Sequence, residues 1–141
     1  MKSNMNKPTP RGIRNNNPLN IRKVLTWLGL SPVQDDAAFC QFRSMELGIR
    51  AACKIIQTYI RKYHLTTVRE IIYRWAPPAD GNDTGSYVRQ VCKRAYYFPE
   101  TCIHADDAIE LTRLIEAMAY VENGVELDRQ VVFKGVLLAL N

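Results

Sequence analysis

The segment from Arg11 to Arg22, RGIRNNNPLNIR, carries side chains that suit a polar, uncharged ligand. Each of its consecutive asparagines offers two amide N–H donors and one carbonyl acceptor. Pro18 fixes its own φ and pushes Asn17 toward extended conformations, which favours an ordered loop. A glycan has matching chemistry, so Asn16, Asn17 and Asn20 are candidate substrate contacts. The alternative is an N-terminal coil whose amides satisfy its own turns.

A second candidate is Glu122, a carboxylate on the apolar side of a predicted helix. It follows Leu111, Ile115 and Met118 at helical spacing, so it continues their inward-facing stripe. Burial and the C-terminal end of the helix dipole both raise the pKa of such a carboxyl toward the range of a general acid. The alternative is a surface residue in a fraying last turn.

Glu46 is the second choice for a catalytic carboxylate. It falls in the first turn of a helix predicted to begin after Ser44. Free backbone amides and the positive end of the dipole stabilise a glutamate there, so a role in helix capping also accounts for it.

The elements that must position these residues are predicted to be mainly helical. Residues 24–43 contain turn signals and one short alternation, which predict an irregular or β-hairpin segment. Helices are predicted from Ser44 to about Tyr63, from a Thr67–Glu70 capping box to about Trp75, from Asp83 or Thr84 to about Ala95, from Asp106 and Asp107 to about Glu122 before Gly124, and from Asp128 to Leu140. Residues 1–141 are expected to form one domain, with residues 1–10 as a flexible tail.

The net charge of +5 is unevenly placed, because every residue before Asp35 is basic or uncharged. Nucleic acid, an acidic membrane surface and the peptides of a bacterial cell wall would all be attracted to such a segment, which is otherwise a solvated tail. No apolar run is long enough for a membrane span, and no signal-peptide core is visible. We therefore expect synthesis in the cytoplasm and delivery by another system if the protein acts outside the cell.

Neither a metal site nor a cofactor is predicted. The four cysteines contain no Cys-x-x-Cys pair, so a zinc site is not expected. Cys40 and Cys53 are expected to be small buried hydrophobes in a reducing compartment, and a bridge between Cys92 and Cys102 stays open.

Several motifs, in the same order, resemble a family of small bacteriophage and prophage proteins described as virion structural or lysozyme-like proteins. The resemblance runs from Arg11 to Gly124 and rests on Arg11 to Ile21, Trp27-Leu28-Gly29, Phe39-x-x-Phe42-x-Ser44, Gly48-Ile49-Arg50-Ala51, Arg74-Trp75-Ala76-Pro77-Pro78, Asn82-Asp83-Thr84 and Tyr87. The family usually has glycine where this chain has Leu19 and glutamate where it has Gly81. The first departure affects the geometry of the loop, and the second removes a carboxylate that could partner the catalytic acid.

A weaker resemblance is to bacterial glucosaminidases and lytic transglycosylases, with the parts reordered. Glu122-Asn123-Gly124 looks like the Glu-Ser-Gly helix end of those enzymes, and Thr84 and Tyr87 resemble an element that borders their clefts. This order implies a circularly permuted, lysozyme-like domain in which the loop from Asn15 to Asn20, called the asparagine loop below, follows Glu122 in space.

The resemblances imply cleavage of the β-1,4 bond between N-acetylmuramic acid and N-acetylglucosamine in peptidoglycan. Glu122 would protonate the leaving oxygen, and Asp83 is the candidate second carboxylate, although it also suits a helix cap. If Asp83 lies elsewhere, the substrate's own 6-hydroxyl or N-acetyl group would attack, as in a lytic transglycosylase. Trp75 and Tyr87 would contact sugar faces, unless they pack in the core.

Two other functions stay open. A non-catalytic virion or cell-wall-binding module would need the polar loop and the aromatic residues but no protonated glutamate. A nucleic-acid-binding protein would use the basic N-terminal segment with Arg89, Lys93 and Arg94, but no recognition helix or stacking platform is evident. Delivery by a phage virion, a lysis system or a secretion apparatus, and an immunity-protein partner, are all compatible with the sequence.

Overall fold

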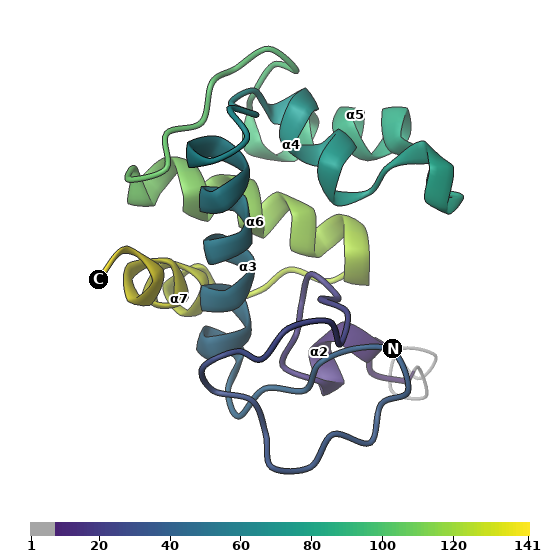
Figure 1. Ribbon diagram of the computed structural model, residues 1–141. Coiled ribbons are helices and arrows are strands. Elements are labelled where there is room, and N and C mark those ends of the chain that lie inside the picture. The colour runs from purple at the N-terminus through teal and green to yellow at the C-terminus, as the bar shows by residue number, and fades with distance from the viewer. Residues whose placement is uncertain (1–7) are drawn as a thin grey trace.

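A computed structural model describes residues 8–141, and it is mainly helical (Figure 1). The prediction of a mainly α single domain is confirmed, while most of the predicted tail, residues 1–7, lies outside the described residues. The elements are α2 (Arg11–Arg14), α3 (Met45–Arg61), α4 (Val68–Trp75), a 3-10 turn η1 (Pro78–Asp80), α5 (Thr84–Ala95), α6 (Ala108–Asn123) and α7 (Arg129–Leu140).

Side-chain caps begin five of these helices. Each cap accepts a hydrogen bond from a backbone N–H of the first turn, and Thr67 and Glu70 form the predicted capping box. The predicted end of α6 is also confirmed, because Gly124 adopts a left-handed φ of 71°. The capping residues are Ser44, Thr67, Asp83, Asp107 and Asp128.

Helix α3 ends two residues before the predicted Tyr63. His64 takes a left-handed φ of 57°, and the N–H of Leu65 donates to the carbonyl of Tyr59 at 3.0 Å. This is the hydrogen-bond pattern with which many helices close their last turn.

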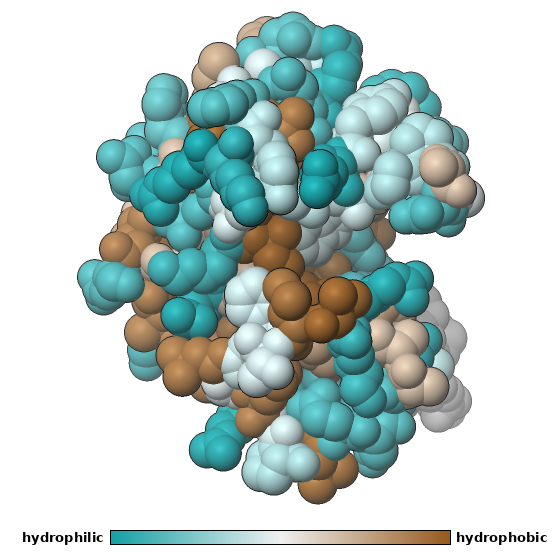
Figure 2. All heavy atoms as spheres, viewed as in Figure 1, coloured by the Kyte–Doolittle hydropathy of each residue, from teal (hydrophilic) through white to brown (hydrophobic). Residues whose placement is uncertain are grey.

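The central part of the domain is built around α3. Helix α7 packs along α3, and α6 lies against both α7 and α5. Helices α4 and α5 form one side of the molecule, and the N-terminal segment with α2 forms the other (Figure 1). Figure 2 shows the surface indented between these two sides. No described helix is long and apolar enough to cross a membrane.

The segment from residue 24 to residue 43 is irregular, and the hairpin alternative does not form. Only isolated bridges pair Arg22 with Phe39 and Leu30 with Phe42. Side chains take up backbone groups that a hairpin would have paired: the Gln41 Oε1 accepts the N–H of Asp35 at 2.6 Å, and the Gln34 Oε1 accepts the N–H of Gln41 at 2.9 Å.

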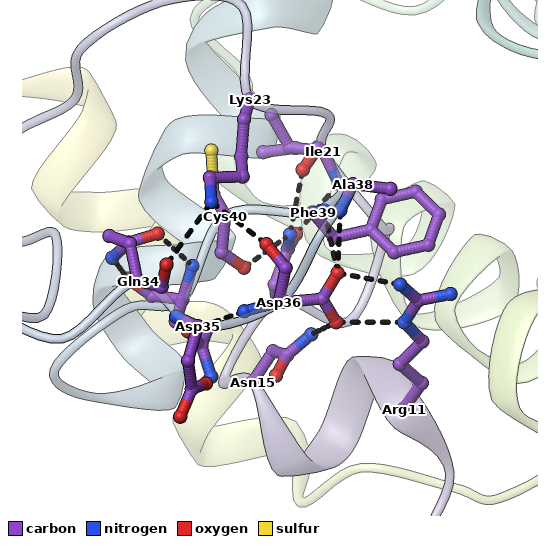
Figure 3. Close-up of polar contacts among 12 residues, drawn as sticks. Arg11, Asn15, Ile21, Lys23, Gln34, Asp35, Asp36, Ala38, Phe39 and Cys40 are labelled. Atoms are coloured by element: carbon purple, nitrogen blue, oxygen red, sulfur yellow. Dashed lines mark hydrogen bonds and ion pairs between the residues drawn. The ribbon is translucent and has the colours of Figure 1, made fainter.

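Asp36 ties this irregular segment to α2 (Figure 3). Its carboxylate accepts two hydrogen bonds from the Arg11 guanidinium, at 2.7 and 2.6 Å, and one from the Asn15 amide at 2.9 Å. The backbone N–H groups of Ala38 and Phe39 donate to it as well. The Arg11 guanidinium, followed by these other donors, holds the pKa of Asp36 far below its usual range.

Gly48 lets the asparagine loop lie directly on α3. A Cβ atom at this position would stand 1.8 Å from the carbonyl oxygen of Asn16. The Asn16 amide donates to the carbonyl of Phe42 at 3.1 Å, which holds the loop against this part of the chain. A side chain larger than hydrogen would therefore separate the loop from the helix.

We predict that Gly48→Ala destabilises the fold by about 3 kcal/mol, the upper part of the usual range for overpacking, because the obstructing atom belongs to the backbone. Urea unfolding followed by circular dichroism measures the change. Gly85→Ala is the matched control. Its Cβ would stand 3.3 Å from the flexible end of Arg89, so stability should be unchanged or raised. Equal midpoints for the two variants would contradict the close approach at Gly48.

Candidate functional site

Glu122 lies at the C-terminal end of α6, where its carboxylate receives hydrogen bonds from two distant segments. The Asn20 Nδ2 donates to Oε1 at 2.9 Å, and the Tyr87 hydroxyl donates to Oε2 at 2.9 Å. The Trp75 side chain adds a weaker polar contact to the same carboxylate. The asparagine loop, the end of α4, α5 and α6 therefore meet at one acidic group.

Burial raises the pKa of Glu122 above its ordinary value. Asn20, Tyr87 and Trp75 act in the opposite direction, because each stabilises the ionised form, but their combined effect is smaller than that of burial. Burial and the nearby Glu122 charge raise the pKa of Tyr87 well above its usual range, so its hydroxyl keeps its proton as the donor. The Glu122 carboxyl is therefore a weaker acid than an exposed glutamate, and hydrogen-bond donors to its ionised form are already in place.

The asparagine loop is fixed to the end of α6 by a further contact. The Asn123 amide donates to the carbonyl of Pro18 at 2.7 Å. Asn20 reaches Glu122 from a left-handed φ of 55°, which asparagine tolerates better than most residues. The preceding Leu19 is buried in the core, so the residue that departs from the resembled family anchors this loop. The loop and Glu122 thus meet in space, as the reordered motifs require; the permutation itself stays a prediction.

Asn17 does not serve as a ligand contact in this conformation, which corrects the sequence-based prediction. It is fully buried, and its side chain donates to the carbonyls of Ile21 and Cys40 and accepts the N–H of Ile21. Asn16 is half-buried, and its amide is engaged by Phe42. Of the three asparagines proposed from the sequence, Asn20 is the one at the carboxylate.

The predicted contacts on α5 face inward as well. Thr84 is buried and donates to the carbonyl of Ala76 at 2.5 Å, so its hydroxyl is occupied within the fold. Tyr87 is buried with its hydroxyl on Glu122, which replaces the predicted contact with a sugar face. Asp83 is exposed and caps α5 through the N–H of Ser86, the alternative role that the sequence left open.

A groove of about 320 Å³ opens beside Glu122. Asn20 and Trp75, which both contact the carboxylate, belong to its wall, and Trp75 packs edge-on against Tyr59. Glu122 itself stands behind these two residues. The groove is lined by Asn20, Ile21, Arg22, Val24, Leu25, Trp27, Ile55, Tyr59, Arg74, Trp75, Pro77 and Asp80.

Asp80 and Trp27 belong to this wall, although neither was predicted from the sequence to be a site residue. Asp80 ends the 3-10 turn after α4 and supplies a carboxylate to the groove, in place of the predicted Asp83. Trp27 comes from the irregular segment. The one signal for Asp80 was its position before Gly81, which has a left-handed φ of 82°.

Glu46, the second choice for the acid, lies half-buried in the first turn of α3 and does not line the groove. Ser44, not Glu46, caps this helix by accepting the N–H of Leu47. Glu46 therefore lacks the surroundings that distinguish Glu122.

The cysteines and histidines of residues 8–141 form no cluster with acidic residues that could hold a metal ion. Burial raises the pKa of the Cys53 thiol to about 12, as expected for a small buried hydrophobe. Cys92 and Cys102 are free thiols, so the disulfide that the sequence left open does not form.

Comparison with known proteins identifies a phage relative. No protein-family model matches the chain. Over 118 residues it is 37% identical to Protein P5 of Pseudoalteromonas phage PM2, a match that covers 81% of this chain and 71% of the relative. The chain belongs to the family of this Protein P5. The sequence-based expectation of a phage relative is thereby confirmed. The name of this relative does not state an activity.

We predict that Tyr87→Phe raises the pKa of Glu122 further, because the ionised carboxylate loses a hydrogen-bond donor. Carbon-13 NMR titration of the glutamate carboxyl groups measures the pKa of Glu122. Since burial already holds this pKa above its unfolded value, the contribution of Glu122 to stability is largest at low pH and is lost as the pH rises through the titration of Glu122. In Tyr87→Phe that loss should move to higher pH.

Tyr97→Phe is the matched control for this prediction. Its hydroxyl donates to the carbonyl of Glu110 at 3.1 Å, near the opposite end of α6. The titration of Glu122 should be unchanged in this variant. A downward shift in Tyr87→Phe would contradict the assignment of the Tyr87 hydroxyl as donor.

Proposed function

We propose that this protein cleaves the glycan strands of peptidoglycan at the β-1,4 bond between N-acetylmuramic acid and N-acetylglucosamine, with Glu122 as general acid. The observation that carries the proposal is the Glu122 carboxyl, buried enough for a raised pKa and joined through Asn20 and Trp75 to an open groove. Carboxyl groups whose pKa is shifted by burial beside a cleft are common at catalytic sites.

In this proposal protonated Glu122 gives its proton to the leaving glycosidic oxygen while positive charge develops on the sugar. The carboxylate that remains is stabilised by the hydrogen bonds from Asn20 and Tyr87. These donors are in place before the reaction, so the hydrogen bonds that stabilise the ionised carboxylate are already formed when the charge appears. Burial favours the protonated acid, and the donors stabilise its ionised form.

The groove offers two kinds of contact to a sugar chain. Trp75 and Tyr59 present aromatic surface, which suits the apolar face of a pyranose ring. Asn20, Arg22 and Arg74 present hydrogen-bond donors along the same wall. The arginines also complement the carboxylates of the lactyl group and of the peptide stems.

Asp80 is the carboxylate that we assign to the second half of the reaction. It lines the groove, whereas Asp83 is engaged as the cap of α5. In a hydrolase Asp80 would activate the attacking water or stabilise the charged sugar. Without such a role, attack by the substrate's own 6-hydroxyl would make the protein a lytic transglycosylase.

A non-catalytic cell-wall-binding module is the second candidate function. Both oxygens of Glu122 already have partners, and the residue stands behind the groove wall, as a carboxylate that fastens the asparagine loop would. The groove would then bind glycan strands without turnover. The phage relative is compatible with either function, with a virion or a lysis system bringing the protein to the wall.

We predict that Glu122→Gln lowers the release of soluble muropeptides from purified peptidoglycan by about 100-fold to 10,000-fold, the usual contribution of general acid catalysis. Mass spectrometry of the products gives the reaction type: anhydro ends mark a transglycosylase and reducing ends a muramidase. Thermal unfolding confirms that the variant is folded. Glycan binding by wild type without any release would instead favour the binding module.

The products of the Asp80→Asn variant distinguish hydrolysis from transglycosylation. If Asp80 activates water, reducing-end products should fall by about 100-fold or more. The comparison variant is Asp83→Asn, which preserves the cap because asparagine is as good an N-cap as aspartate. Loss of activity in Asp83→Asn with full activity in Asp80→Asn would return the role to Asp83.

A further inference from the structure

A residue in the wall of the groove beside Glu122 carries a hydrogen-bond donor that the described residues leave unused. The indole N–H of Trp27 is shielded from solvent and has no partner within residues 8–141. Trp27 also belongs to the groove wall. Because buried polar groups in folded proteins are nearly always paired, an unpaired donor in the wall of a groove points to an acceptor on a ligand.

The position of Trp27 is fixed by the turn that follows it. Gly29 takes a left-handed φ of 88°, and a Cβ there would stand 2.7 Å from the side chain of Leu47. The N–H of Arg43 donates to the Gly29 carbonyl at 2.9 Å. The segment is thereby held on the first turn of α3, and the Trp27 ring packs against the core.

The surroundings of this donor select among sugar substituents. Apolar side chains of Val24, Leu25 and Ile55 line the same groove. An acetamido group combines a carbonyl acceptor with a methyl group, so it satisfies both the N–H and the apolar wall. A hydroxyl would leave the apolar wall unfilled, and an ammonium group cannot accept a hydrogen bond.

We propose that the Trp27 indole N–H donates to the carbonyl oxygen of a 2-acetamido group and makes the groove selective for N-acetylated glycans. This inference rests on the proposed function, because it assumes that a glycan occupies the groove. Val24 and Leu25 are 81% and 64% exposed. In this proposal the ligand displaces side chains of the groove wall to reach the shielded nitrogen.

The two tryptophans of the chain give a direct test, because each contributes one indole N–H signal to a nitrogen-15 NMR spectrum. The folded Glu122→Gln variant is titrated with tetra-N-acetylchitotetraose and with cellotetraose, which has the same β-1,4 backbone with a hydroxyl in place of each acetamido group. Trp27→Phe and Trp75→Phe assign the signals. The Trp27 signal should move downfield with the N-acetylated tetramer and stay in place with cellotetraose.

Affinity gives a second measure. In the Glu122→Gln background, Trp27→Phe should lower the preference for the N-acetylated tetramer over cellotetraose by about tenfold, the value expected for one hydrogen bond. Trp75→Phe should weaken binding of both tetramers and leave their ratio unchanged. The spectra of the variants and their thermal unfolding show whether each is folded.

The two titrations distinguish the role of Trp27 from the presence of a glycan site. A chitotetraose titration that moves the Trp75 signal and leaves Trp27 in place would retain a glycan site and overturn the role of Trp27. Equal movement of the Trp27 signal by cellotetraose would overturn the selectivity for acetamido groups. No change in either signal with either tetramer would overturn both.

Discussion

The site depends on the attachment of the asparagine loop to the C-terminal end of α6. Asn123 donates to the carbonyl of Pro18, and Asn20 donates to Glu122 one residue earlier on the helix. Gly12 permits this contact, because a Cβ there would stand 2.5 Å from the Asn123 Oδ1. Segments about a hundred residues apart in the chain thereby share one surface, and the groove wall that Asn20 contributes exists only while they are joined.

The balance at Glu122 is between desolvation and hydrogen bonding. A buried carboxylate without partners would be strongly destabilised, whereas a well-solvated one would ionise near its ordinary pKa. The donors from Asn20 and Tyr87 make burial tolerable without reversing its effect on the pKa. This intermediate condition distinguishes Glu122 from Asp36, whose carboxylate has an ion pair and several donors and therefore has a strongly lowered pKa. The Asp36 carboxylate is suited to fastening a loop, whereas the Glu122 carboxyl can exchange a proton.

Local signals explain what the sequence could predict. Caps such as Thr67 with Glu70 act within one helical turn, and the apolar stripe of α6 places Glu122 on the inner face of that helix. Both features could therefore be predicted without knowledge of the fold. Asn17 and Thr84 were misjudged because each binds a carbonyl to which no helical or turn pattern of the sequence points. Asn17 binds that of Cys40, 23 residues away, and Thr84 binds that of Ala76 across the turn after α4. The segment from residue 24 to residue 43 failed to form a hairpin for a related reason, since side chains outside any short-range pattern took its backbone hydrogen bonds.

A local physical reason favours glycine at position 81. The backbone there has a φ of 82°, and no atom stands within 4 Å of the place a Cβ would occupy, so conformation rather than space favours glycine. A glutamate in that conformation would cost roughly 1–2 kcal/mol. Asp80, one residue earlier, keeps an ordinary backbone at the end of the 3-10 turn and still presents a carboxylate to the groove. The chain thus avoids strain at the turn and retains an acidic group, Asp80, on the wall of the groove.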